Sequence, residues 1–564
     1  MRRHNEGAAA PFLFLLCASA ALFLAAESCH EAWASKSDPS KEMRQETGKW
    51  DVVKGSPKSC KAGARKIQCA SKTGEDHWVL SRDVLQGNWA LEARFEVGEP
   101  ASSGILFEVQ DDLKYGYLLT LDPDLTLWRI KDGQIDSKSR ELMNLHAKVL
   151  AMAHHEDQAA DEKSKLAAAI ENHKGFQTLR IVKTGGTYAF WENGLLVTTI
   201  SNPRQDSTEW KSEHEPEAGR YGFAMTGQGV SKVMPLAVHP LQLAVKDANN
   251  PILKPGPSGS WDDAIIFTGS VMKEGDTYYL YFTGRDTHSK KDGGAVGVAT
   301  SKDLEYWTEN PHNPILTDDS VKGIWDYTLQ AGSVVRAPDG RYALFYDGSD
   351  GDNWRGIGVA FSDSPLGPFH RYEGNPVLTR GNSGEFDSHA MHLHTARRQE
   401  DGTYLLFYTG YPSDASKGRK GDRGGLATSR DLIHWEKYAG NPVFDLGPLG
   451  AWDDTHVRPK TLVKRGDWYY MFYEGTNNDG VFWWDQVGMA RSPDLIHWQR
   501  FPFNPIIPLG TSGAYDSAVT EWPAAFIERT DFNVFYMCGP MIQMRLMICK
   551  SKLPESVLQS WDVK

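Results

Sequence analysis

Short apolar runs separated by turn residues make up the chain beyond residue 240. These runs lack the 3.6-residue spacing of apolar positions that marks an amphipathic helix, so they predict β-strands. The clearest example is residues 452–475, where a Trp-Asp start, an inner run, a charged turn and an aromatic run follow one another and end at Gly475. We therefore expect antiparallel strands joined by short turns in this part of the chain.

The same pattern recurs five times at a nearly fixed spacing. Its copies occupy residues 261–284, 325–348, 386–410, 452–475 and 515–539, and successive copies begin 61 to 66 residues apart. Each copy is followed by a run that ends on Ser, such as GVATS or GLATS, and Asn-Pro pairs close the units. Four short strands in each of five units is a propeller pattern. The sequence thus predicts an all-β protein with a five-bladed β-propeller over residues 243–564.

Residues 48–242 also read as β-sequence, with a hairpin signal at Asn193-Gly194 between two apolar runs. The order TLRIVKTGGTYAFWENGLLV and then GRYGFAMTG resembles the concanavalin-like, laminin-G-like sandwich that is often attached to secreted carbohydrate enzymes. The resemblance implies a β-sandwich (jelly-roll) domain, which serves either to bind glycan or as a scaffold docked on the propeller. Residues 140–174 are rich in Ala, Glu, Lys and Leu and predict a helical insertion. We expect its histidines, His154, His155 and His173, to be surface residues rather than metal ligands.

The first 34 residues have the features of a secretory signal peptide. Two arginines precede an apolar run over residues 11–26, and Ala-Trp-Ala at 32–34 offers a cleavage site. A polar linker follows at residues 35–47, and the apolar run is too short to favour a stable membrane span. We expect a secreted or periplasmic protein, or one at the cell surface.

Four cysteines follow the signal segment as two sequence-near pairs, Cys60 with Cys69 and Cys538 with Cys549. This arrangement suits two local disulfides in an oxidising compartment. Four buried free thiols are the alternative.

Charge and motifs exclude several classes of partner. The net charge of −12 leaves no basic surface for nucleic acid or an anionic membrane. The sequence has no Gly-rich phosphate loop between a strand and a helix, which argues against a nucleotide. It also has no HExxH or paired CxxC motif for a catalytic zinc ion.

Polar residues near the start of each unit are expected to meet, because the innermost strands of all blades line one channel. The Asp of Trp-Asp recurs in every unit, and this recurrence favours a turn cap. Departures from the repeat are more informative: only two units carry a second carboxylate, Asp263 and Asp454. Strand alternation places Asp454, His456, Arg458 and Lys460 on one face, which predicts a polar pocket.

Five blades, S-x-D-L-x-x-W turns and N-P-[IV]-[LIF] closings resemble the propellers of glycoside hydrolase families 43, 32 and 130. In family 43 a Glu in an E-x-P setting is the acid, and Glu521-Trp522-Pro523 matches that setting, so the resemblance implies an acid role for Glu521. The families' Asp-Pro pair is absent, and Arg458-Pro459 stands at the comparable place. The base is expected to be Asp263, with Asp454 tuning its pKa, or the reverse, and Asp326 and Asp387 are the reserve candidates.

The expected partner is a carbohydrate, cleaved with inversion between carboxyl groups roughly 6.5–9.5 Å apart. Trp483-Trp484-Asp485 could offer a sugar platform. No cofactor is expected to be required, although the resemblance implies that a structural calcium ion could occupy the channel. A binding protein without catalysis, and a phosphorylase that uses Arg458 and Lys460 for phosphate, remain alternatives. The substrate-binding candidates are Asp326, Asp387, His389, His392, His456, Arg458 and Trp522.

Overall fold

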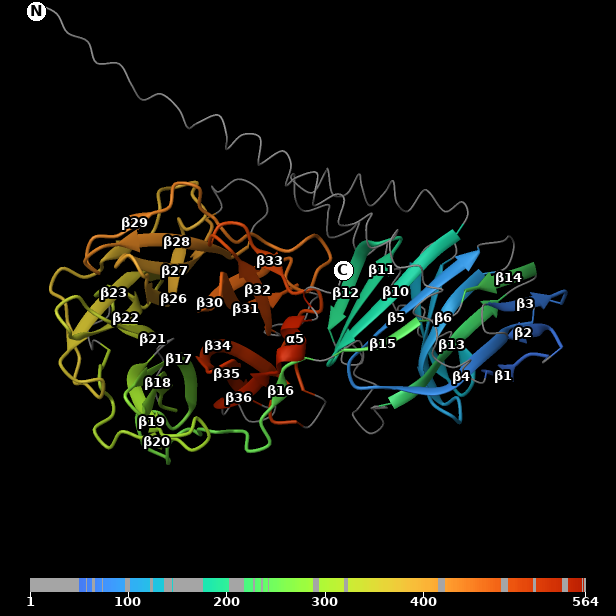
Figure 1. Ribbon diagram of the computed structural model, residues 1–564, viewed down its shortest axis with the longest axis horizontal. Coiled ribbons are helices and arrows are strands. Elements are labelled where there is room, and N and C mark those ends of the chain that lie inside the picture. Colours follow the sequence, from blue (N-terminus) through green and yellow to red (C-terminus); the bar gives the residue numbers. More distant parts are fainter. Residues whose placement is uncertain are drawn as a thin grey trace, which may run out of the picture.

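The computed structural model describes the chain from residue 50 onward, with gaps (Figure 1). The described residues are 50–56, 58–62, 66–73, 75–96, 102–121, 125–135, 145, 176–201, 218–226, 229–234, 237–241, 243–287, 294–318, 323–413, 421–477, 485–510, 514–539, 546–559 and 561. The expected signal peptide and linker, the helical insertion apart from Leu145, and Trp483-Trp484 lie outside them.

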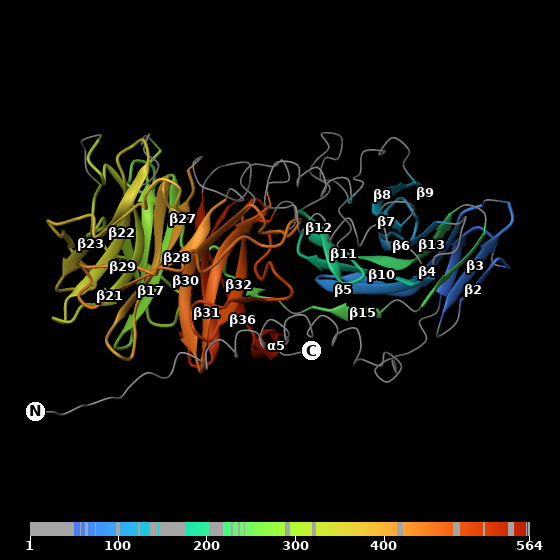
Figure 2. The same ribbon diagram turned by 90° about the horizontal axis from the view of Figure 1, so that it is seen from above.

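Two β-domains lie side by side in the structure, as Figures 1 and 2 show. The first is a sandwich of two sheets and the second is a five-bladed propeller, so the all-β prediction is confirmed. Within the described residues the named elements are strands apart from one short helix, α5 (Glu555–Gln559), and Leu145 is also helical. No helix in this part of the chain is long and apolar enough to cross a membrane.

The sandwich encloses an aromatic core between its sheets, which includes Trp89, Phe107 and Phe190. The order of the first sheet is β1-β4-β13-β6-β7-β8-β9, and that of the second is β12-β11-β10-β5-β14-β3-β2 with β15 paired to β5. The expected Cys60–Cys69 disulfide joins β2 to β3. The strands are β1 (Trp50–Lys54), β2 (Cys60–Ala62), β3 (Ile67–Ser71), β4 (His77–Gln86), β5 (Trp89–Glu96), β6 (Ser102–Val109), β7 (Tyr115–Leu121), β8 (Leu125–Lys131), β9 (Gln134–Ile135), β10 (Phe176–Thr184), β11 (Thr187–Glu192), β12 (Leu195–Ser201), β13 (Ala218–Thr226), β14 (Gly229–Val233) and β15 (Ala237–Pro240).

Each propeller blade is an antiparallel sheet whose first strand lies innermost, and the inner strands contact one another in a ring from β17 round to β34. Blade 1 is β17 (Ile265–Glu274), β18 (Thr277–Arg285), β19 (Ala295–Ser301) and β20 (Thr308–Glu309). Blade 2 is β21 (Thr328–Arg336), β22 (Tyr342–Ser349), β23 (Trp354–Ser362), β24 (His370–Arg371) and β25 (Leu378–Thr379). Blade 3 is β26 (Ala390–Arg398), β27 (Tyr404–Tyr411), β28 (Arg423–Ser429) and β29 (Glu436–Lys437). Blade 4 is β30 (His456–Arg465), β31 (Trp468–Thr476), β32 (Gln486–Ser492) and β33 (Gln499–Arg500). Blade 5 is β34 (Val519–Glu528), β35 (Asp531–Gly539), β36 (Met547–Leu553) and β16 (Val245–Lys246).

The repeated Asp of Trp-Asp forms a brace across its own blade. In blade 4, Asp453 accepts hydrogen bonds from the Tyr473 hydroxyl (2.9 Å) and from Nε of Arg500 on the outer strand (2.7 Å). Three other blades repeat this brace of Asp, Tyr and a cation, which accounts for the recurrence of the Asp. They are Asp326 with Tyr346 and Arg371, Asp387 with Tyr408 and Lys437, and Asp516 with Tyr536 and Lys246.

The Asn of each Asn-Pro pair fixes the third strand of a blade. Asn441, for example, accepts the Leu426 N–H through Oδ1 (2.9 Å) and donates through Nδ2 to the Leu426 carbonyl (2.9 Å). These bonds satisfy backbone groups that would otherwise lack a partner at this point of the sheet.

Every inner strand carries a β-bulge at an equivalent place. A bulge adds a residue to one strand and re-aims its side chain. The added residues include Gly269 in β17 and Gly332 in β21, which lack side chains, and His394, Lys460 and Trp522 in the next three inner strands. The bulges therefore turn three large side chains toward one another inside the ring.

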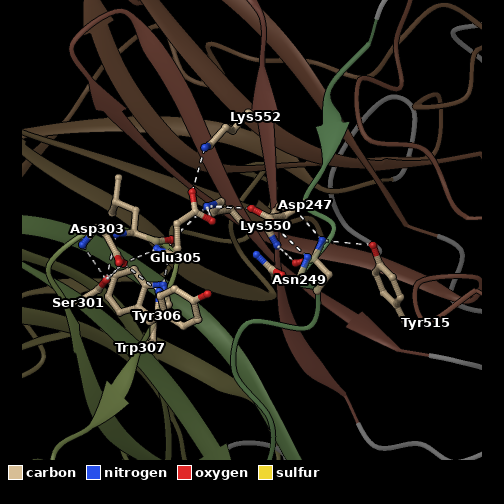
Figure 3. A network of polar contacts seen from close by, with 12 residues as sticks. Asp247, Asn249, Ser301, Asp303, Glu305, Tyr306, Trp307, Tyr515, Lys550 and Lys552 are labelled. Atoms are coloured by element: carbon tan, nitrogen blue, oxygen red, sulfur yellow. Dashed lines mark hydrogen bonds and ion pairs between the residues drawn. The ribbon is translucent and has the colours of Figure 1, made fainter.

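The ring closes because β16, ahead of blade 1, pairs with β36 of blade 5. Figure 3 shows the polar network at this closure. The fully buried Lys550 ammonium pairs with Asp247 (3.0 Å) and with Glu305 in the turn of blade 1 (2.5 Å). The expected Cys538–Cys549 disulfide joins β35 to β36 beside it.

Candidate active site at the propeller mouth

Antiparallel pairing brings the start of each inner strand against the end of the second strand of its blade. Gln330 lies opposite Asp347, His392 opposite Thr409, and Arg458 opposite Glu474. Because the inner strands are neighbours in a ring, these polar pairs face one end of the channel. We call this end the mouth.

Arg458 is the centre of an ion-pair network on blades 3 and 4. Its Nε donates to Asp422 (2.7 Å) and its Nη1 donates to Asp485 (2.6 Å). The His456 ring lies 3.0 Å from the same Asp422 oxygen. Burial raises the pKa of Asp422, but the attraction of Arg458 and His456 outweighs this and the net shift is downward. Asp422 is therefore an ionised partner that holds Arg458 in place.

Lys460, on the bulge of β30, links three groups of the mouth. Its Nζ lies 3.3 Å from Glu474 Oε2 and 3.4 Å from the centre of the Trp522 ring. Burial lowers the pKa of Lys460, and the Glu474 charge opposes that shift. Burial raises the pKa of Glu474, partly offset by the Lys460 charge. Glu474 also accepts the backbone N–H of Trp522, so it helps to hold the bulge of β34.

Trp522 adopts a positive φ of 53°, which is strained for a bulky residue. Its carbonyl accepts a hydrogen bond from Thr268, and its ring stacks on Phe267 with the centroids 5.5 Å apart. With the Glu474 bond, these contacts hold the backbone beside Glu521 in one conformation.

Glu521 is buried, with 8% of its surface exposed. Burial raises its pKa well above the ordinary value, and the charges of Asp485 and Glu474 add to the shift, against the opposing effect of Arg458 and Lys460. Glu521 is thus a carboxyl group that keeps its proton at a pH where an exposed Glu has lost it.

A second group of side chains lies on blades 2 and 3. Asp347 is fully buried and hydrogen-bonds to the His392 ring. Two half-buried aromatic rings flank His392, with centroid distances of 4.5 Å to Trp354 and 5.3 Å to Tyr411. Aromatic rings of this kind offer a face on which a sugar ring can stack.

Three buried polar atoms of the mouth have no hydrogen-bond partner among the described residues. They are Gln330 Oε1, Asp347 Oδ1 and His394 Nδ1, each on a side chain at most 5% exposed. Burial, with the charge of Lys460, lowers the pKa of His394 well below its ordinary value, so its ring is neutral. Unsatisfied buried polar groups are rare and indicate a ligand or water that completes them. The mouth therefore has spare hydrogen-bonding capacity.

The structure assembles some of the predicted site residues and places others elsewhere. Trp522, His392, His456 and Arg458 lie in the mouth, as the contacts above show, and Glu521 directly precedes Trp522 on β34. Asp326 and Asp387 instead form braces that point toward the outer strands of their blades. His389 is exposed at the start of blade 3.

Asp263 and Asp454 lie in turns ahead of β17 and β30. Asp263 accepts the N–H groups of Gly259 (2.7 Å) and Thr287 (2.6 Å), and Asp454 accepts the N–H of Gly450 (2.6 Å). These contacts are those of turn caps. The catalytic roles expected for the two residues stay predictions, and the chemistry proposed below does not use them.

Three carboxylates of the mouth were not predicted as site residues: Asp347, Asp422 and Glu474. A fourth, Asp485, was expected only as part of a sugar platform with Trp483-Trp484. A signal for two of them exists in the repeat, because the aromatic runs of the first four units end FTG, YDG, YTG and YEG. The acidic departures in the second and fourth units are Asp347 and Glu474. Asp422 and Asp485 stand at equivalent places, three residues before a Gly of the third strand.

The calcium ion that the resemblance implied for the channel stays a prediction, but it does not fit beside Lys460. The Lys460 ammonium occupies the region between Glu474 and Trp522, and a calcium ion needs oxygen ligands rather than a neighbouring cation. Within the described residues no group of three or more His, Cys, Asp or Glu side chains is arranged to hold a metal.

The fold and the mouth define the class of the protein: a five-bladed β-propeller with an acidic, aromatic-lined mouth, preceded by a β-sandwich. Residues 30–233 match a family model described as a 3-keto-alpha-glucoside-1,2-lyase-like domain. Over 281 residues the chain is 27% identical to the uncharacterized protein Rv1502 of Mycobacterium tuberculosis. The matched region covers 47% of this chain and 84% of that protein.

Two solved structures are among those that match this chain. One is a thermostable family-43 glycoside hydrolase, with 19% identity, a TM-score of 0.39, and coverage of 53% of this chain and 93% of that one. The other is a beta-1,2-mannobiose phosphorylase from Listeria innocua, with 14% identity, a TM-score of 0.42, and coverage of 57% and 99%.

Proposed function

We propose that this protein is a glycoside hydrolase that cleaves a bond of a neutral poly- or oligosaccharide at the propeller mouth, with Glu521 as general acid. The observation that carries the proposal is the buried Glu521 carboxyl with its raised pKa, on inner strand β34 directly before Trp522, whose ring contacts Lys460 and His394 of the mouth. A glycosidic oxygen leaves readily only when it is protonated. A carboxyl group that retains its proton toward neutral pH can supply that proton.

Asp347 is the second carboxyl of the proposal, acting as base. It is held by His392, and its Oδ1 has no partner among the described residues. Asp347 and Glu521 both contribute to the pKa of Lys460, so the two carboxyls share that ammonium as a neighbour. The two carboxyls differ in their surroundings, because Asp347 is held by His392 whereas Glu521 has carboxylates as neighbours.

The charges of the mouth favour a neutral sugar. Among the described residues, five carboxyl groups meet there with two permanent cations, Arg458 and Lys460, and each cation is already paired. A uronic acid or inorganic phosphate would meet this acidic surrounding without a free cation. We therefore expect hydrolysis rather than phosphorolysis, and no stimulation of sugar release by phosphate.

The test is release of reducing sugar from a panel of neutral glycans, with and without phosphate. Glu521→Gln is expected to lower kcat by about 10²–10⁴-fold, the usual contribution of a general acid. Glu436→Gln, on an exposed outer strand, is the matched control and should retain activity. Unchanged turnover in Glu521→Gln would remove Glu521 from the acid role, and phosphate-dependent release would favour the phosphorylase.

A non-catalytic sugar-binding propeller is the second candidate, because the expected Asp-Pro pair is absent from the inner strand. Binding of a glycan without release of sugar by the wild-type protein would establish it. Export is part of the proposal in either case, since the two disulfides suit an oxidising compartment.

A further inference from the structure

The sandwich meets the propeller along its edge strand β12 and the next strand, β11, which lie on the side of the sandwich that faces the propeller in Figures 1 and 2. Thr199 of β12 donates its N–H to the carbonyl of Gly450 in a turn of blade 4 (2.7 Å). Asn477, just after β31, donates through Nδ2 to the Thr199 hydroxyl (2.9 Å). The turn of blade 4 thus covers a strand edge that would otherwise expose unpaired backbone groups.

A second contact of this seam lies deeper. The Thr187 hydroxyl of β11 is within hydrogen-bond distance of the Gln486 side-chain amide, at 3.0 Å from Nε2 and 3.1 Å from Oε1. Gln486 Oε1 also accepts the Leu509 N–H (3.2 Å). Both side chains are almost fully buried, with 3% of Thr187 and 1% of Gln486 exposed. A buried amide with two protein partners is held in one orientation.

Gln486 is the first residue of β32 and directly follows Asp485, the carboxylate that binds Arg458. Its register partner in β31 is Gly475, the neighbour of Glu474. Successive side chains of a strand point to opposite sides. The same short pair of strands therefore presents Gln486 to the sandwich and two carboxylates to the mouth.

We propose that Thr187 and Gln486 are positioning residues, through which the sandwich fixes the start of β32 and so holds Asp485 against Arg458 in the mouth. The proposal rests on the proposed function for its catalytic consequence. Its geometric part, a mouth whose acidic partners are held from the other domain, stands on the contacts alone.

Loosening Asp485 has a directional effect on Glu521. The Asp485 charge is the largest contribution after burial that raises the pKa of Glu521. Moving that charge away is expected to lower the Glu521 pKa, so that Glu521 loses its proton at a lower pH. A general acid that deprotonates earlier shifts the alkaline limb of the pH–rate profile to lower pH.

The experiment compares Thr187→Val, which removes the hydroxyl at nearly constant volume, with Thr187→Ser, which keeps it. Thr198→Val is the control, because Thr198 is a buried residue of the same domain whose hydroxyl lies near the backbone of its own strand. In Thr187→Val we expect kcat/KM on neutral glycan to fall on the order of tenfold to a hundredfold, as for small misplacements of reacting groups. The alkaline limb should move to lower pH in Thr187→Val. The Thr187→Ser variant should keep both the kcat/KM and the alkaline limb of the wild type.

A second readout needs no substrate. The difference in thermal midpoint between each protein and its Glu521→Gln counterpart is measured against pH. This difference changes with pH between the unfolded-state and folded-state pKa of Glu521, so the higher pH at which it levels off reports the folded-state pKa. We expect this point to move to lower pH in Thr187→Val and to stay in place in Thr198→Val. An unmoved point in Thr187→Val would overturn the positioning role. A shifted point in a protein whose wild type releases no sugar would retain the positioning role and refute the proposed hydrolysis.

Discussion

Buried carboxylates of the propeller differ in the groups that donate hydrogen bonds to them. Asp263 and Asp454 accept backbone N–H groups in turns, and Asp453 accepts a tyrosine and an arginine within one blade. Such donors stabilise the charged form and serve the fold. Glu521 lies instead among other carboxyl groups, and Glu474 shares one lysine with it. This contrast separates the structural acids from the candidate catalytic acids.

Glu521→Gln is expected to stabilise the protein at pH 7 while removing activity. The folded protein holds the Glu521 proton more tightly than the unfolded chain, so the stability contribution of this group is intact below the unfolded pKa of about 4.3. It is lost as the pH rises from there through the raised folded-state pKa. Thermal midpoints of the two proteins at pH 4 and pH 7 check this. A variant that is less stable than the wild type at pH 7 would show that the Glu521 carboxylate is a structural partner.

Asp454→Ala is expected to cost about 1–2 kcal/mol of stability through loss of a turn cap and to leave the pH profile of activity in place. The Gly450 N–H would lose its acceptor in a turn that docks on the sandwich. Denaturant unfolding and the pH–rate profile measure the two effects. A loss of kcat of about 10²-fold or more without loss of stability would restore the catalytic role that the sequence suggested for Asp454.

At the scale of elements, blade 1 departs from the brace that the other four blades contain. Its second strand has Phe282 in place of the Tyr, and its outer strand has Glu309 where the others have Arg or Lys. As a result Asp262 Oδ2 has no partner among the described residues. Burial and the nearby Asp262 charge raise the pKa of Glu309. Blade 1 therefore carries a repulsion where its neighbours carry an ion pair.

Glu309→Lys should supply the missing cation and stabilise the protein by about 1.5–3 kcal/mol, the range for hydrogen bonds to charged groups. Glu309→Gln is the control, because it removes the repulsion without adding an ion pair. The free energy of unfolding of both variants measures the gain. If the lysine variant is no more stable than the glutamine variant, the brace does not form in blade 1.

Much of this organisation was predictable from repeats, because a blade is a local unit whose strands follow one another in the chain. The five units, the Asn-Pro closings and both cysteine pairs fall in this class. The mouth was only partly predictable. Asp347 and Glu474 lie on the second strands of their blades, whereas site residues were expected on the innermost strands alone. The bulges at Lys460 and Trp522 were also hidden, because no sequence pattern here marks a shift in strand register.

At the scale of the whole molecule, the closure around Lys550 joins the first blade to the last. Lys550→Met would leave Asp247 and Glu305 without their buried partner, and we expect a cost of about 3–5 kcal/mol. Lys552→Met is the matched control, since Lys552 is an exposed partner of Glu305 and should cost at most about 1 kcal/mol. Urea unfolding of the two variants tests the difference, and equal costs would contradict it.

The same closure adds an acid-sensitive contribution to stability. Burial raises the pKa of Asp247, but the Asn249 amide and Lys550 outweigh it and the net shift is downward. This stabilisation is present above the unfolded pKa of about 3.9 and is lost as the pH falls through the lower folded-state value. Thermal midpoints measured from pH 5 down to pH 2 should fall less steeply for Lys550→Met than for the wild type. Parallel curves would show that the pair carries no such dependence.

The pairing of β16 with β36 joins Val245 to Lys552, at opposite ends of the propeller sequence. During synthesis on the ribosome the sandwich and the first four blades emerge while this contact cannot yet form. Until then Lys246 cannot form its ion pair with Asp516, its brace partner in blade 5. The propeller therefore forms first as an incomplete ring of blades, which closes only when β36 pairs with β16. A nascent chain arrested before residue 547 should remain sensitive to protease at the first and at the last blade present.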